Sequence, residues 1–228
     1  MKKAGCTHVI VETSSQGLEQ YRHKGINYDI AVITNLTPEH IEAHGGFGNY
    51  KKAKGLLFSH LTDKSHKVID NKTIEKTIIV NGDDEHYRFY LEYNADKKYV
   101  YGIDLDHKYE EGANQVKAQN IGLEKKVHFD YKGSNIALDL LGKFNVYNSL
   151  AAISVAEGLG IKKESIKKGL EKVNHIDGRL ELIQEGQPFH VIVDYAYEPK
   201  SLVKGFNALK NIKHNKIIHV VGSCGGGR

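Results

Sequence analysis

The sequence predicts an α/β protein with a mostly parallel sheet and flanking helices. Short apolar runs between polar turns are typical of buried parallel strands, and the first two lie at residues 8–11 and 29–34. Residues 48–61 then place apolar side chains at helical spacing, with lysines between them. Short strand-like runs and stretches with helical spacing both recur toward the end of the chain, a pattern that is typical of the α/β class.

The composition disfavours several classes of protein. Of the 228 residues, 40% are hydrophobic and 26% are charged, as in ordinary globular proteins and unlike disordered chains. No uncharged apolar stretch approaches the roughly 20 residues that span a bilayer, so we expect a cytoplasmic protein without a membrane partner. The net charge is only +4, and lysines are interleaved with acids, as in Lys163-Glu164, which disfavours a nucleic-acid partner. We expect a monomer.

The next elements follow from the same patterns. Asn-Gly, Asp-Asp and Gly turn signals separate short apolar or alternating runs, which predict strands at residues 67–69, 77–80, 99–103, 127–131 and 136–140. Two stretches with helical spacing and helix stop signals follow, and they predict helices at residues 145–158 and 161–173.

A domain boundary is expected at Asp177-Gly178, which divides the chain into residues 1–177 and 178–228. After the boundary, the pattern predicts strands at 180–183 and 190–194, a helix at 199–212 and a strand at 216–221. About 50 residues are too few for a complete Rossmann-like unit. We therefore expect the start of a Rossmann-like α/β C-terminal domain.

Polar side chains follow both of the first two strands, at the sheet edge where open α/β sheets bind ligands. Glu12 and Ser14 follow the first strand, and His40 follows the second. Serine is also a common helix N-cap, and a single histidine is more often structural or on the surface. Lys54 is expected on the inner face of the helix at 48–61, where a lysine needs a compensating charge.

Longer strings make this pattern specific. They are ETSSQGLEQYR at 12–22, TNLTPEHIEAHG at 34–45 and YKKAK at 50–54. These strings resemble the central-domain motifs of the Mur ligase family, closest to the MurE type. The similarity continues in the same order at 81–84, 142–148, 178–181 and 193–196. It therefore identifies residues 1–177 as a Mur ligase central domain that lacks its N-terminal part, and 178–228 as the start of the C-terminal domain.

The resemblance implies an enzyme that uses ATP and Mg²⁺. MurE-type ligases join a diamino acid to UDP-N-acetylmuramoyl-L-alanyl-D-glutamate in peptidoglycan synthesis. ATP phosphorylates the D-glutamyl side-chain carboxylate, and the incoming amine attacks the resulting acyl phosphate. The expected ligands are therefore ATP, Mg²⁺, the UDP-N-acetylmuramoyl-dipeptide and a diamino acid.

The resemblance also assigns roles to individual residues. Lys54 would be carbamylated by CO₂ and, with Glu12 and His40, would form the catalytic and Mg²⁺-binding set. The residues implied to contact the UDP-sugar dipeptide are Ser14, Gln20 and Arg22. The residues implied to contact ATP are Asn145, Asn148, Arg179 and Asp194.

The sequence departs from the family pattern at several points. No GxxxxGK[ST] phosphate-binding string occurs in the chain. Gln16 stands where histidine is usual, Glu39 and Glu42 where aspartate is usual, and Gly227 replaces an aspartate. We therefore expect a piece of a MurE-type ligase without the N-terminal domain, the phosphate loop and most of the C-terminal domain. Such a piece should be weakly active or inactive alone.

Two alternative functions stay open. A ligase of the MurF, MurD or folylpolyglutamate type would share the carbamylated lysine and the ATP site, although the string Ser-Ser-x-Gly-Leu-x-Gln-x-Arg at 14–22 favours the MurE type. A non-catalytic binding protein is the second alternative, since the fold can persist without the phosphate loop. The choice between diaminopimelate and lysine as the added amino acid is also open.

Overall fold

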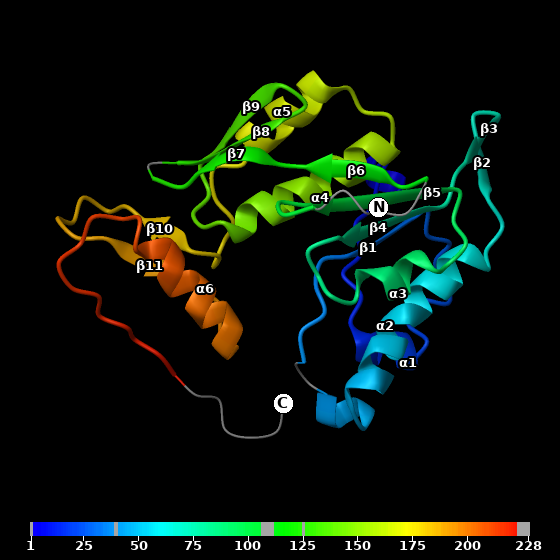
Figure 1. Ribbon diagram of the computed structural model, residues 1–228, viewed down its shortest axis with the longest axis horizontal. Coiled ribbons are helices and arrows are strands. Elements are labelled where there is room, and N and C mark those ends of the chain that lie inside the picture. Colours follow the sequence, from blue (N-terminus) through cyan, green and yellow to red (C-terminus); the bar gives the residue numbers. More distant parts are fainter. Residues whose placement is uncertain (1, 39–40, 106–111, 125, 223–228) are drawn as a thin grey trace.

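A four-stranded parallel sheet with the strand order β1-β4-β5-β6 forms the centre of the molecule (Figure 1). The structure is a computed structural model that describes residues 2–38, 41–105, 112–124 and 126–222. The strands are β1 (Ile30–Ile33), β4 (Thr77–Asn81), β5 (Lys97–Gly102) and β6 (Asn114–Lys117). Strand β4 is buried from Thr77 to Val80, as expected for a central strand covered on both faces.

Helices cover both faces of this sheet (Figure 1). They are α2 (Phe47–Thr62), α3 (Tyr87–Leu91) and α4 (Phe144–Gly158). Ile79 of β4 lies in a core cluster with Leu150 of α4. The adjacent Ile78 lies in a second cluster with Phe58 of α2 and Tyr90 of α3. The two neighbouring isoleucines thus point to opposite faces, because side chains alternate along a strand.

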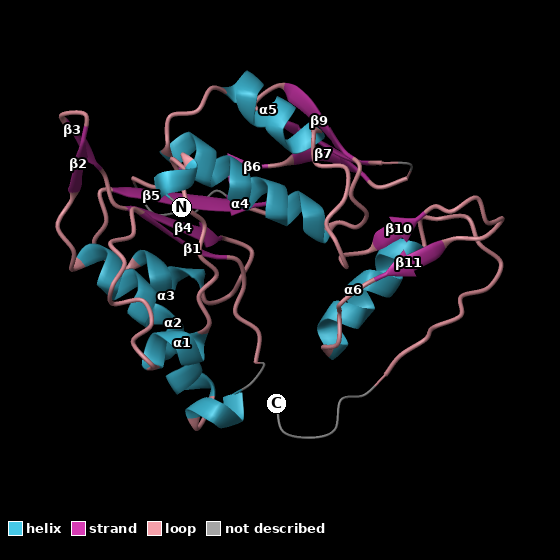
Figure 2. Ribbon diagram, turned by 180° about the vertical axis from the view of Figure 1, so that it is seen from behind, coloured by secondary structure: helices cyan, strands magenta, loops and turns pink. Residues whose placement is uncertain are grey.

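A second, antiparallel sheet extends the core beyond α4 (Figure 2). Phe129 and Ile136 of this sheet belong to the same core cluster as Leu150. Helix α5 packs against this sheet and against α4. The elements are β7 (Gln119–Gly122), β8 (Val127–Tyr131), β9 (Ser134–Leu138) and α5 (Lys163–Glu171), and a separate hairpin consists of β2 (Lys67–Ile69) and β3 (Lys72–Ile74).

The chain after Gly178 forms a small group of elements beside α4 (Figures 1 and 2). Strand β10 (Glu181–Ile183) pairs antiparallel with β11 (Val191–Val193), and α6 (Pro199–Leu209) follows. A Cβ atom added to Gly142, just before α4, would lie 3.0 Å from the Cβ of Ala208 in α6. The loop that begins α4 therefore lies directly against α6.

Most of the expected elements are confirmed. The helix expected at 48–61 is α2, and the helices expected at 145–158, 161–173 and 199–212 are α4, α5 and α6, with ends that differ by one to three residues. The strands expected at 29–34, 67–69, 77–80, 99–103, 127–131 and 136–140 are β1, β2, β4, β5, β8 and β9. The strands expected at 180–183 and 190–194 are β10 and β11. The sequence patterns did not indicate α1, α3, β3, β6 or β7.

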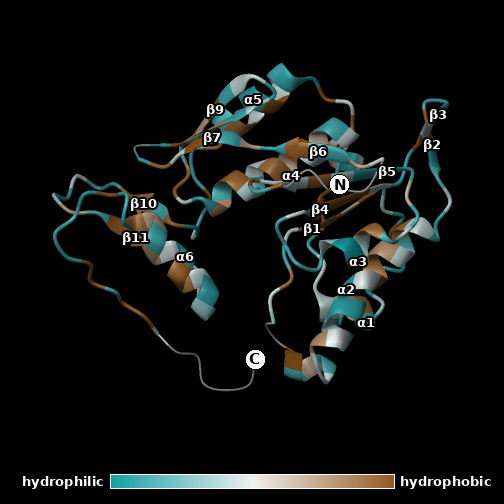
Figure 3. Cartoon of the chain, in the orientation of Figure 1, coloured by the Kyte–Doolittle hydropathy of each residue, from teal (hydrophilic) through white to brown (hydrophobic). Residues whose placement is uncertain are grey.

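Two expected strands are wrong. Residues 8–11 and 216–221 have no regular structure, and Ile10 is 97% exposed and Val220 is 91% exposed. Figure 3 shows apolar residues along the irregular segment that follows α6. A strand forms only where a neighbouring strand satisfies its backbone groups, and neither segment has such a neighbour among the described residues. Without a strand at 216–221, the described part of 178–222 contains an antiparallel pair instead of the expected βαβ unit.

No described helix is long and apolar enough to cross a membrane.

Stability should depend on pH through His23. This side chain is buried, and its ring lies edge-on to that of His60 with the centroids 4.7 Å apart. Burial lowers the pKa of His23 from its ordinary value of 6.5, and the charges of His60 and Lys24 lower it further. Below about pH 6.5 the unfolded chain therefore binds more protons than the folded chain, so the free energy of unfolding falls as the pH decreases.

We expect the urea midpoint to decrease from about pH 7.5 to about pH 5.5, and to decrease less in the His23→Gln variant. Equal pH dependence of the two proteins would contradict this prediction.

Candidate active site

The residues expected to bind the UDP-sugar dipeptide surround the short helix α1 (Ser15–Glu19). Ser14 is the N-cap of α1, and its Oγ accepts a hydrogen bond from the backbone N–H of Gly17 at 3.1 Å. Gln20 is the C-cap, and the backbone N–H of Arg22 donates to the Gly17 carbonyl at 3.0 Å. All three side chains are exposed, and they flank α1: Ser14 and Gln20 are its caps, and Arg22 follows it. Ser14 has the N-cap role, and substrate contact by the three residues stays a prediction.

Lys54 lies in the third turn of α2 and is half-buried. Its Nζ lies 5.0 Å from the ring centroid of Tyr50, one turn earlier. Lys51 is half-buried on the same helix, and its Nζ lies 4.9 Å from the ring centroid of Phe89. Both lysine amines therefore lie near an aromatic ring. An ammonium group over an aromatic ring is attracted by the negative face of the ring.

The expected metal-binding set is only partly described. Glu12 is exposed in the irregular segment before α1, and His40 lies outside the described residues. No group of three or more His, Cys, Asp or Glu residues that could hold a metal ion occurs in the described part of the chain. Carbamylation would give Lys54 two oxygen atoms, and with the Glu12 carboxylate these are the hard ligands that Mg²⁺ prefers. The chemistry of this donor set therefore fits Mg²⁺.

The residues expected to bind ATP lie in two places. Asn145 is buried at the start of α4, where its Nδ2 donates to the Leu141 carbonyl at 2.8 Å, and Asn148 donates to Asn145 Oδ1 at 2.9 Å. Arg179 and Asp194 are exposed beside the β10–β11 pair. Since the loop before α4 lies against α6, the two places belong to neighbouring parts of the chain. Contact of these four residues with ATP stays a prediction.

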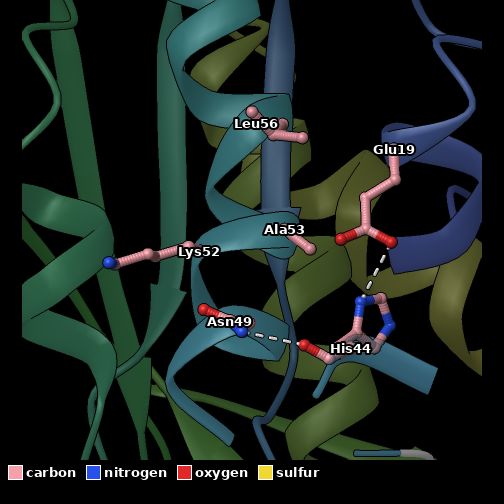
Figure 4. A pocket seen from close by; sticks show the side chains of 6 residues that line it. All are labelled: Glu19, His44, Asn49, Lys52, Ala53 and Leu56. Atoms are coloured by element: carbon pink, nitrogen blue, oxygen red, sulfur yellow. Dashed lines mark hydrogen bonds and ion pairs between the residues drawn. The ribbon is translucent and has the colours of Figure 1, made fainter. Parts of the chain in front are cut away.

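An open hollow of about 270 Å³ lies between α1 and α2 (Figure 4). It is lined by Glu19, His44, Asn49, Lys52, Ala53 and Leu56. None of the side chains expected to bind substrate, ATP or metal lines it, although Glu19 and Ala53 are direct neighbours of Gln20 and Lys54. His44 ends the short 3₁₀ helix η2 (Ile41–His44), and Figure 4 shows its ring beside the Glu19 carboxylate.

Two aspartates connect the loops at the carboxyl ends of the parallel strands. Asp83 Oδ2 accepts from the backbone N–H of Ile103 at 2.7 Å and from that of Asp104 at 3.2 Å, which fixes the chain after β5. Asp84 Oδ2 accepts from the backbone N–H of Leu36 at 2.7 Å, which fixes the chain after β1. A hydrogen bond to Asp83 also raises the pKa of Tyr147 in α4, after the larger effect of burial. These contacts hold the loops at the carboxyl ends of the parallel strands in one arrangement.

Two family matches together cover most of the chain. Residues 1–156 match the Mur ligase middle domain, and residues 178–228 match the glutamate ligase domain of Mur ligases. The chain belongs to the Mur ligase family. The resemblance of the strings at 12–22, 34–45 and 50–54 to this family is therefore confirmed.

This Mur ligase chain is similar to curated proteins over its whole length. It is 36% identical over 228 residues to the UDP-N-acetylmuramoyl-L-alanyl-D-glutamate–2,6-diaminopimelate ligase of Halalkalibacterium halodurans, covering 100% of this chain and 45% of that protein. It is 34% identical to the UDP-N-acetylmuramyl-tripeptide synthetase of Roseiflexus sp., covering 99% of this chain and 44% of that protein. The chain therefore spans less than half the length of these relatives.

Solved structures of Mur ligases share this fold. A structure of UDP-N-acetylmuramoyl-L-alanyl-D-glutamate–2,6-diaminopimelate ligase matches 92% of this chain and 41% of its own, with a TM-score of 0.70 and 26% identity. MurF from Acinetobacter baumannii matches 85% of this chain and 40% of its own, with a TM-score of 0.66 and 26% identity. The α/β architecture of this Mur ligase chain is thus that of the family.

Several residues with structural contacts in this Mur ligase chain have no role in the predictions made from the sequence. Ser15, Glu19, His44, Asp83 and Asp84 all lie inside the strings that carry the family resemblance. Their contacts join residues that are 20 to 48 positions apart in the sequence. A signal existed for His44, because histidine is a residue type that often carries function. Its partners could be found only in the structure.

Removal of the Asp83 carboxylate should destabilise the chain. The Asp83→Ala variant removes the acceptor of two backbone N–H groups, the exposed one of Asp104 and that of the buried residue Ile103; an unsatisfied buried donor costs about 1–3 kcal/mol. Urea denaturation measures the loss in the free energy of unfolding. The Asp104→Ala variant, which removes an exposed carboxylate from the same loop, is the matched control and should lose less than about 0.5 kcal/mol. Equal losses in the two variants would contradict the role of Asp83 in fixing the chain after β5.

Proposed function

We propose that this chain is part of an ATP-dependent ligase of the MurE type. The ligase joins a diamino acid to UDP-N-acetylmuramoyl-L-alanyl-D-glutamate in peptidoglycan synthesis, in the cytoplasm. The observation that carries this proposal is the 36% identity over all 228 residues to a relative that is named as the diaminopimelate-adding ligase. In this proposal, residues 1–177 form the central domain and residues 178–228 belong to the C-terminal domain.

The proposed roles of the residues follow from their positions. Ser14, Gln20 and Arg22 bind the UDP-sugar dipeptide from the exposed side of α1, and the planar guanidinium of Arg22 suits an anionic group. Asn145 and Asn148 bind ATP at the start of α4, and Arg179 and Asp194 bind it from the second domain. The three residues proposed to hold Mg²⁺ are Glu12, His40 and carbamylated Lys54.

The chemistry requires these groups to act on developing negative charge. The D-glutamyl carboxylate attacks the γ-phosphorus of ATP and gives an acyl phosphate and ADP. The amine of the diamino acid then attacks the acyl carbon, the amide bond forms, and phosphate leaves. Mg²⁺, when bound, would neutralise phosphate charge. The cationic side chain of Arg22 would hold the substrate in the orientation that brings its carboxylate to the nucleotide.

A full-length protein that contains this chain tests the proposal. Phosphate release is measured with ATP, Mg²⁺, the UDP-sugar dipeptide and either diaminopimelate or lysine. We expect release that requires all four components, with one of the two amino acids preferred. Release without the UDP-sugar dipeptide, or none in any combination, would overturn the proposal. The 228-residue chain alone should show little or no release, because it has no GxxxxGK[ST] string to cradle the phosphates.

A MurF-type ligase is the second candidate. Its support is the TM-score of 0.66 with MurF from Acinetobacter baumannii, against 0.70 for the diaminopimelate-adding ligase. The same assay with a UDP-sugar tripeptide and D-alanyl-D-alanine distinguishes the two, since only a MurF-type ligase would release phosphate with that pair.

A further inference from the structure

His44 lies at the junction of the two elements that carry the proposed substrate-binding residues and Lys54. Its side chain is fully buried between α1 and α2. The ring Nε2 lies 3.0 Å from Ser15 Oγ, and Nδ1 lies 3.1 Å from Glu19 Oε2, as Figure 4 shows for the second contact. Both partners belong to α1, so one imidazole is held against the first and the last residue of that helix.

The other contacts of His44 connect it to α2. Asn49 Nδ2 donates to the backbone carbonyl of His44 at 2.9 Å, which fixes the start of α2 against η2 (Figure 4). The imidazole centroid lies 5.4 Å from the ring centroid of Tyr50, and the Nζ of Lys54 lies 5.0 Å from that same Tyr50 ring. A continuous set of contacts therefore runs from α1 through His44 and Tyr50 to the amine of Lys54.

We propose that His44 is a positioning residue that holds α1 and the Lys54 amine in a fixed relation to each other. The inference rests on the proposed function, because it explains how the substrate-binding side chains on α1 are aligned with the reacting groups near Lys54. A buried imidazole whose Nε2 is hydrogen-bonded to Ser15 and whose Nδ1 lies beside the Glu19 carboxylate is held in one orientation, so it transmits the position of one element to the other. A shift of about 1 Å at such a site lowers a reaction rate markedly.

The contacts also have the order of a Ser-His-acid triad, but Ser15 is unsuited to be a nucleophile. Its side chain lies at the start of α1, is 8% exposed and does not line the hollow beside Glu19. A substrate carbonyl must approach the serine oxygen of a triad closely. Positioning is therefore the role that the geometry supports, and labelling of Ser15 by a serine-directed fluorophosphonate would overturn it.

The first test uses steady-state kinetics of the full-length ligase. His44→Leu keeps a buried side chain of similar size and removes both polar contacts. We expect the KM for the UDP-sugar dipeptide to rise at least about tenfold and the KM for ATP to change less than about twofold, because the proposed dipeptide contacts flank α1, whereas the proposed ATP contacts lie at α4 and beside the β10–β11 pair. The side chain in His44→Gln can still donate and accept a hydrogen bond, so this variant should recover part of the loss. Equal changes in the two KM values, or no rescue by glutamine, would overturn the inference.

The matched control is His60→Leu. His60 is also a buried histidine; it lies on α2, and its Nε2 lies 2.8 Å from the Ile26 carbonyl, so its polar contact does not involve α1. This variant should lose stability without the selective rise in the KM for the dipeptide. The same selective rise in His60→Leu would show that the effect on KM is a general consequence of destabilisation, and it would overturn the inference.

The second test does not depend on ligase activity. Competitive acetylation of the folded protein measures the reactivity of Lys54, with Lys51 of the same helix as an internal standard. Loss of His44 should release Tyr50 from its position under Lys54, and we expect labelling of Lys54 relative to Lys51 to rise about two- to fivefold in His44→Leu. An unchanged ratio would overturn the inference. If the wild-type ligase is inactive with the UDP-sugar dipeptide, the proposed function is wrong. The ratio of Lys54 to Lys51 labelling then decides the role of His44 by itself.

Discussion

Replacement of Lys54 by alanine will reduce the kcat/KM of the full-length ligase by about 10²–10³-fold, the loss expected when one preorganised group that stabilises developing charge is removed. The proposed role requires CO₂ to bind the Lys54 amine and turn a cation into a carboxylate. Added bicarbonate should therefore restore little activity to Lys54→Ala, because the variant has no amine to accept CO₂. Steady-state phosphate release with and without bicarbonate measures both effects.

Lys51→Ala is the control for this experiment. Lys51 lies three residues earlier on α2, is also half-buried, and has its Nζ over the ring of Phe89 as Lys54 has over Tyr50. Lys51→Ala shortens a lysine of the same helix and leaves the proposed carbamylation site intact, so kcat/KM should change less than about threefold. Equal losses in the two variants would show that the loss in Lys54→Ala is not specific to the proposed carbamylation site.

A direct measurement of the modification accompanies the kinetics. In bicarbonate, native mass spectrometry of the protein should show a mass increase that corresponds to one CO₂, and this increase should be absent from Lys54→Ala. If Lys54 stays unmodified in the active ligase, its proposed role is wrong.

Replacement of Phe58 by alanine should cause the largest loss of stability, about 3–5 kcal/mol. Phe58 is 0% exposed between α2 and the sheet, and its ring centroid lies 4.9 Å from that of Tyr90 and 5.9 Å from that of Tyr93. The smaller side chain leaves a cavity that these rings fill only in part. Urea denaturation measures the change in the free energy of unfolding.

Val68→Ala is the matched control for this prediction. Val68 lies on the β2–β3 hairpin and is 67% exposed, so its replacement should change stability by less than about 0.5 kcal/mol. A loss below about 1 kcal/mol in Phe58→Ala would mean that the packing between α2 and the sheet is looser than the structure indicates.

The sequence alone predicted the long helices and the buried central strands, whose patterns are local. The spacing of apolar residues in α2 and α4 predicts those helices, and the apolar run of β4 predicts a central strand, because periodicity is a property of the segment itself. The strings at 12–22, 34–45 and 50–54 identified the family, and their order along the chain gave the candidate site residues.

Local sequence patterns give wrong predictions where an element forms only beside a neighbouring strand. Residues 8–11 are as apolar as β1, yet Ile10 is 97% exposed and no strand forms there, since pairing requires a second strand at the right place. Residues 216–221 form no strand for the same reason. In β6 the strand forms beside β5 although its sequence, Asn-Gln-Val-Lys, is largely polar.

The residue types and their order along the chain determined the family, the helices and the set of side chains that could act on a nucleotide and a carboxylate. Only the tertiary structure decided which of them touch. Ser15 and His44 are 29 residues apart, and their hydrogen bond exists because α1 packs on α2. Asp83 and Ile103 meet only because β4 and β5 lie side by side. Side-chain contacts at long sequence separation are set by packing of whole elements, and no local pattern records that packing.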